Sequence, residues 1–164
     1  MIWQPSSKKR GSKMVAAMNP VEVLDRLIAA SIDSEKRYRH AAKDVGRVSL
    51  EAFMNWQADN RKAAADELNE ERTSLGGNGH ESGTWNGLVD RAALDISVAM
   101  SKGDTGVAEW CKEDDQAVVA EYESALQQDL PEHLRRLLER QLGLVKGAVN
   151  KLAGVLSVFG EPRS

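Results

Sequence analysis

The chain of 164 residues is long enough to form one domain with a sizeable core. Its composition, 41% hydrophobic and 29% charged, excludes an intrinsically disordered protein. A single cysteine, Cys111, excludes an intrachain disulfide and is typical of a reducing compartment, so we expect a cytoplasmic location. Aromatic residues make up only 5%, helix-forming residues are abundant, and no alternating β-pattern is convincing. The chain is therefore predicted to be all-α.

Charge is unevenly distributed along the sequence. The net charge is −3, but the first 19 residues carry +4, so the remaining 145 carry −7. Residues 1–18 are predicted to be a basic, disordered tail, and residues 19–160 a single domain. Because an acidic body repels phosphate, we expect no nucleic-acid partner. No uninterrupted apolar stretch approaches about 18 residues, so no membrane span is expected.

The first predicted helix runs from Pro20 to about Val45. Asn19 suits its N-cap, Pro20 its first position, and Glu22 completes the spacing of a capping box. Gly46 is expected to end it. One stripe at helical spacing should pack against other helices: Val21, Leu24, Ile28, Ser31, Glu35, Tyr38, Ala42 and Val45. Only the glutamate is unsuited to a core, and a buried carboxylate must be neutral, hydrogen-bonded, paired or metal-bound.

Three further long helices are expected. Ser49 is predicted to cap a second helix that ends before the glycines at 76, 77 and 79. A short helix over residues 84–101 follows, and Asp104 is predicted to cap a third long helix reaching about Ala125. The turn at residues 129–131 leads into the most apolar helix, which ends near Phe159 and should be the central core element.

The lengths of the links suggest a topology. The first and second long helices, and the third and fourth, are joined by a few residues each, whereas nearly 30 residues separate the second from the third. Short links require antiparallel neighbours. Two helical hairpins joined by a long crossover that contains a short extra helix form a ferritin-like four-helix bundle, not a plain up-down bundle.

Candidate chemistry centres on one predicted layer of the bundle. Depth along the helices, at about 1.5 Å per residue, places Glu35 level with Asn60 and Asp114. Glu71 and Glu121 should lie deeper, near Gln141. Two carboxylates and an amide could form a structural polar network or bind one hard cation such as iron or manganese. A di-iron bundle needs Glu-x-x-His motifs, and the sequence has none.

Several segments resemble a proteobacterial family of unknown function within the ferritin-like superfamily. The resemblance covers about residues 20–157 and implies a ferritin-like four-helix bundle, without implying an activity. Many members carry a histidine in the last helix where this chain has Val149, and that departure weakens the case for a metal site. The matching segments are DSEKRYRHAAKDV at 33–45, LGG at 75–77, AL at 125–126, DLP at 129–131, ERQ at 139–141 and VK at 145–146.

Two functions from different classes follow. The favoured one is a non-enzymatic bundle without a cofactor that associates with itself, as a dimer or higher oligomer, or with a protein partner; a role in bacterial stress physiology rests on analogy with ferritin-like proteins alone. The alternative is a metal-dependent oxidoreductase or iron-handling protein that uses Glu35 and Asp114, with Asn60, Glu71 and Glu121 around them.

Overall fold

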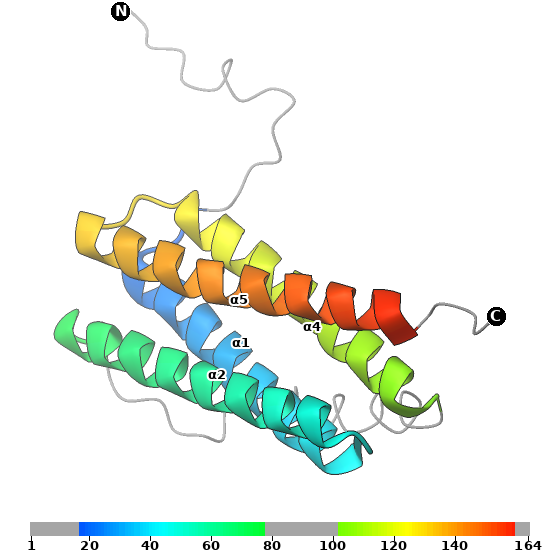
Figure 1. Ribbon diagram of the computed structural model, residues 1–164. Coiled ribbons are helices and arrows are strands. Elements are labelled where there is room, and N and C mark those ends of the chain that lie inside the picture. Colours follow the sequence, from blue (N-terminus) through cyan, green and yellow to red (C-terminus); the bar gives the residue numbers. More distant parts are fainter. Residues whose placement is uncertain (1–16, 78–101, 160–164) are drawn as a thin grey trace, which may run out of the picture.

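Four long helices make up the part of the chain that the computed structural model describes, residues 17–77 and 102–159 (Figure 1). They are α1 (Pro20–Asp44), α2 (Val48–Ser74), α4 (Gly103–Leu126) and α5 (Glu132–Phe159). The prediction of an all-α chain with four long helices is confirmed. The predicted short helix over residues 84–101 and residues 1–16 of the predicted tail lie outside the described residues.

The start of α1 is formed as its sequence predicts. The Asn19 side chain accepts a hydrogen bond from the backbone N–H of Glu22 at 2.9 Å, and the Glu22 carboxylate accepts from the N–H of Asn19 at 3.2 Å. This reciprocal pair satisfies two of the N–H groups that the first helical turn leaves free. Met18, assigned to the tail from the sequence, packs against the core and donates its N–H to the Gln128 side chain at 3.0 Å.

Near the C-terminal end of α1, two of the predicted helix caps are wrong. Ser49 does not cap α2, because this helix begins at Val48 and Arg47 occupies its N-cap position. Asp104 does not cap α4 either, because α4 begins at Gly103. Instead, the Asp104 carboxylate accepts hydrogen bonds from the N–H groups of Gly46 at 2.8 Å and Arg47 at 3.2 Å. Asp104 thereby satisfies two N–H groups of the α1–α2 link and fixes this link against the start of α4.

This contact also fixes the direction of the chain. Helices α1 and α2 form one antiparallel hairpin, and α4 and α5 form the other (Figure 1). The start of α4 lies beside the α1–α2 link, whereas α2 ends at the opposite end of the bundle, where Gly76 adopts a φ of +83°. Residues 78–101 therefore connect opposite ends of the four-helix arrangement. Helix α1 packs against both α2 and α4, but α2 and α5 make little contact with each other.

The apolar core is divided into two clusters along the bundle axis. One surrounds the first half of α1 and the other its second half. Helix α5 contributes to both through one stripe of buried residues, Leu134, Leu138, Gln141, Val145, Ala148 and Leu152. The prediction that α5 is the central core element is wrong, because its other faces are exposed at Leu144 and Val158.

Candidate functional site

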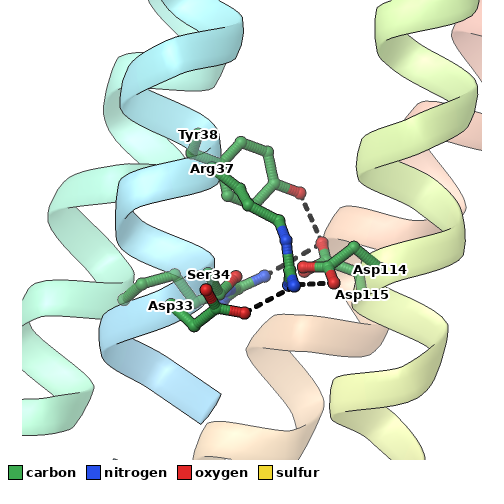
Figure 2. Close-up of polar contacts among 7 residues, drawn as sticks. Asp33, Ser34, Arg37, Tyr38, Asp114 and Asp115 are labelled. Atoms are coloured by element: carbon green, nitrogen blue, oxygen red, sulfur yellow. Dashed lines mark hydrogen bonds and ion pairs between the residues drawn. The ribbon is translucent and has the colours of Figure 1, made fainter. Parts of the chain in front are cut away.

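Between the two apolar clusters lies a layer of buried polar side chains. At its centre the carboxylate of Asp115, on α4, has an exposed fraction of 0%. Arg61, from α2, donates to it at 3.0 Å, and the Tyr38 hydroxyl donates to the same oxygen in a short hydrogen bond (Figure 2). Arg61 also donates to the Ser34 hydroxyl at 3.2 Å, and its guanidinium lies 5.5 Å from the centroid of the Tyr38 ring. These contacts join α1, α2 and α4 at one level.

A second charged group lies beside this layer, on the outer side of α1 and α4. Arg37 forms an ion pair with Asp33, one turn earlier on α1, at 2.5 Å. It also donates to Asp114 of α4 in a short ion pair, as the sticks in Figure 2 show. Two carboxylates therefore share one guanidinium. One oxygen of Asp33 is buried and accepts no hydrogen bond from the described residues.

Burial shifts the pKa values of this layer. Burial raises the pKa of Asp114 to about 6, although Arg37 opposes the shift. Burial also raises the pKa of Asp115, against the opposing effects of Arg61 and Tyr38, and that of Asp33. The pKa of the Tyr38 hydroxyl is raised well above its usual value, first by burial and then by the nearby Asp115 carboxylate. Each shift follows from removing a charged form from water.

The predicted layer of Glu35, Asn60 and Asp114 is not the layer that the structure shows. The Glu35 side chain is 23% exposed and lies 3.6 Å from Arg39, so it is not the buried carboxylate of α1. Asn60 is only half-buried, whereas Gln57 and Arg61 of α2 face the core. Asp114 does lie at the level of the polar layer, but its neighbour Asp115 occupies the buried position.

The two deeper glutamates are also placed differently from the prediction. Glu71 lies 3.1 Å from the His133 ring, and Glu121 pairs with Arg26 at 3.1 Å. Gln141 is buried as expected, but its partners are the Tyr122 hydroxyl at 2.8 Å and the backbone carbonyl of Ala64 at 3.4 Å. Neither glutamate hydrogen-bonds Gln141 in the described part of the chain.

These contacts bear on the predicted metal site. Within residues 17–77 and 102–159, no group of three or more histidine, cysteine, aspartate or glutamate side chains could hold a metal ion. Glu35 and Asp114 each face an arginine, and a guanidinium has no lone pair to offer a metal. The arrangement is that of a structural ion-pair network, and metal binding by Glu35 and Asp114 stays a prediction.

The residues that sequence reasoning missed are Arg61 and Asp115. Both belong to helical stripes as regular as those predicted. The buried stripe of α4 is Val107, Cys111, Asp115, Val118, Tyr122 and Ala125, and that of α2 is Leu50, Met54, Gln57, Arg61, Ala65, Leu68 and Arg72. In α4, Tyr122 could have identified the buried stripe that contains Asp115, because a tyrosine fits a core position better than the neighbouring Glu121 does.

An exposed apolar surface lies along the side where α2 and α5 make little contact. On α5, Arg140 pairs with Glu67 of α2, so the α5 stripe that contains this arginine faces α2. That stripe is Leu137, Arg140, Leu144, Gly147, Lys151, Gly154 and Val158. On α2, the stripe that contains Glu67 continues through Ala63 and Asn60 to Trp56, which is 57% exposed. We call these two stripes the α2–α5 face.

Helix α5 is unusually apolar for its exposure. Among the described helices it alone is long and apolar enough, by length and composition, to cross a membrane, a test that core helices of other proteins also pass. Only 22% of its most apolar 18-residue stretch is buried, which is low for a core helix. Lys146 and Lys151 interrupt this stretch, so the sequence contains no uninterrupted apolar run of that length.

Comparison with known proteins gives a family. Residues 19–128, about two thirds of the chain, match a family described as a domain of unknown function, DUF2383. The match includes α1, α2 and α4, together with both carboxylate groups of the polar layer, and it ends before α5. No curated protein matches the chain. The chain belongs to the DUF2383 family of domains of unknown function.

Proposed function

We propose that this protein is a non-enzymatic, ferritin-like bundle that acts by associating with a second copy of itself through the α2–α5 face. The ferritin-like arrangement is supported by the direction of the helices. The third long helix starts at the same end as the link between the first two, so the chain runs up, down, down and up (Figure 1). A plain up-down bundle would place that start at the opposite end.

The observation that carries the proposal is the exposed apolar surface of the α2–α5 face. Trp56 of α2 and Leu144 and Val158 of α5 are all exposed on it, and Gly147, Lys151 and Gly154 lie between the two α5 residues. Exposed large apolar residues that are scattered singly need no explanation, but their grouping on one side of two neighbouring helices supports an interaction site. Because Gly147 and Gly154 have no side chain beyond a hydrogen, another helix can approach the α5 backbone closely.

The size and charge of this face suit a second copy. From Leu137 to Val158 the α5 stripe is about 32 Å long. Across two helices, each about 10 Å wide, this gives about 600 Å² per copy, close to the 800 Å² of a standard interface. In a two-fold pair, the same surface meets itself. Lys151 of this face and the exposed Glu70, which follows Glu67 by three residues on α2, carry opposite charges, and such charges could pair between two copies.

The polar layer supports a structural interpretation. Arg61 and Asp115 neutralise each other inside the bundle, and Arg37 neutralises one of its two carboxylate partners, so these groups fix the helices in register. The metal-dependent alternative would need Glu35 and Asp114 to give up their arginine partners. A cytoplasmic location, with Cys111 buried as a free thiol, is part of the same proposal.

The test compares variants of the full-length chain by light scattering coupled to size-exclusion chromatography. The wild type is expected to elute with the mass of a dimer or a higher oligomer. Leu144→Glu places a charge in the middle of the α2–α5 face and should give a monomer with unchanged helicity by circular dichroism. The matched control is Ala120→Glu, an exposed position on α4, which should leave the mass unchanged. A wild-type monomer, or equal masses for both variants, would contradict the proposal.

A further inference from the structure

A groove of about 400 Å³ lies between α1 and α4, on the outer side of the polar layer. Its floor consists of small or short apolar side chains, Ala29 and Ala30 from α1 and Ala117 and Val118 from α4. Charged side chains lie at its two ends. One end holds Arg26 and Glu121, and the other holds the Arg37 group described above.

The charges at the two ends are not equal. Arg26 and Glu121 form a one-to-one ion pair at 3.1 Å, so that end is neutral. At the other end Arg37 is shared by Asp33 and Asp114, so the close ion pairs leave one negative charge in excess, and Lys36 acts on Asp33 from beyond ion-pair distance (Figure 2). Asp33 is 8% exposed, and one of its oxygens accepts no hydrogen bond from the described residues. Two largely buried carboxylates that share one guanidinium favour an additional positive charge beside them.

We propose that this groove binds a small linear aliphatic amine, with its primary ammonium group at Asp33 and Asp114 and its methylene chain along the alanine floor. The ammonium group supplies the missing positive charge and three donors. Asp114 and Glu121 are seven residues apart on α4, so the groove is about 10 Å long and can hold a chain of several methylenes. Burial of apolar chain on Ala30 and Ala117 adds affinity, about fourfold for each methylene that is fully covered.

This inference is independent of the proposed dimer, because the groove lies between α1 and α4 and the α2–α5 face contains no residue of either helix. It also differs from the predicted metal site. A hard metal ion needs several oxygen ligands around it, whereas the groove offers an apolar floor next to a single excess charge.

The experiment is a titration of the full-length ¹⁵N-labelled protein with n-hexylamine, followed by two-dimensional NMR. We expect saturable shifts of the amides along the groove. Methylamine, which lacks the chain, should bind at least tenfold more weakly, and n-hexanol, which lacks the charge, should not saturate. If methylamine binds as tightly as n-hexylamine, the alanine floor does not contribute to binding. If n-hexanol binds saturably, the carboxylates are not required. Either result overturns the proposal.

Variants locate the site. Ala117→Leu fills the floor at an exposed position, so the fold should survive and the binding of n-hexylamine should fall at least tenfold. Ala120→Leu, one turn away and outside the groove, is the matched control and should bind as the wild type does. Asp114→Asn removes the excess charge and should also weaken binding about tenfold. Saturable binding that Ala117→Leu leaves unchanged would show that the amine binds elsewhere, and no saturable binding to the wild type would refute the proposal outright.

Discussion

Replacing Arg61 by methionine tests the central ion pair of the polar layer. The change keeps most of the side-chain volume but removes the cation that neutralises Asp115, whose side chain is fully buried. Breaking a buried ion pair by removing one partner costs about 3–5 kcal/mol, because the remaining charge is left without compensation. For a chain of this length, that loss corresponds to a decrease of roughly 6–20 °C in Tm.

The second half of this test restores neutrality. Asp115→Asn alone leaves Arg61 buried without its anion and should also destabilise the fold. The double variant Arg61→Met/Asp115→Asn removes both charges, while the new amide oxygen still accepts from the Tyr38 hydroxyl. It should therefore be more stable than the sum of the two single changes predicts, by more than about 2 kcal/mol.

The assay is urea unfolding of the wild type, the two single variants and the double variant, followed by circular dichroism. Arg136→Met, which breaks an exposed pair with Glu132, is the control and should change stability very little. A second signature is pH dependence: Arg61→Met should regain stability as the pH falls, because protonation of Asp115 removes the buried charge. If each single variant costs less than about 1 kcal/mol and the effects add, the ion pair is not the organising contact of this layer.

Three further predictions concern carboxylates at different positions. The pKa of Asp114 is raised in the folded protein to about 6, so the folded state binds the extra proton between about pH 4 and 6, and stability falls as the pH rises through this range. Asp114→Asn should reduce that slope, to which Asp33 and Asp115 also contribute, and should stabilise the fold at pH 7 by at most about 3 kcal/mol. Urea unfolding at pH 4.5 and 7 measures the slope, and an unchanged slope would refute the assignment. Asp104→Ala should cost about 1 kcal/mol, because two N–H groups of the α1–α2 link lose their acceptor, whereas Glu113→Ala on the exposed side of α4 should not. Glu35→Gln should be neutral within about 1 kcal/mol, because it breaks only a half-exposed pair with Arg39; stoichiometric iron or manganese in the wild type that is lost in this variant would establish the metal-dependent alternative.

The helices could be predicted from the sequence because their ends carry strong local signals. The Asn19–Glu22 capping box and the glycines after α2 act through neighbouring residues, and both are found where the sequence predicts them. Asp104 shows where such reasoning stops. Its position at the start of α4 suggests that it caps this helix, but its carboxylate accepts hydrogen bonds from backbone N–H groups more than 50 positions earlier. Which N–H groups donate to Asp104 is determined only by the packing of α4 against the α1–α2 link.

The candidate site was harder to predict, because a helical stripe can step by three or four residues. On α4, a step of three from Cys111 reaches Asp114, and a step of four reaches Asp115; both are aspartates, so the sequence pattern does not distinguish them. On α2, the predicted layer used Asn60, one position before Arg61, and arginine is a residue that is rarely buried. Burial of Arg61 becomes favourable only because it forms an ion pair with Asp115 on another helix. The sequence pattern of one helix cannot reveal a contact between two helices.

The most direct test of the proposed association is sedimentation equilibrium of the full-length protein over a wide range of concentrations. If the α2–α5 face binds a second copy, the weight-average mass should rise with concentration from that of one chain, 18.0 kDa, toward at least twice that value. The Leu144→Glu variant should stay at the mass of one chain throughout. A wild-type mass that remains 18.0 kDa at every concentration would contradict self-association through this face.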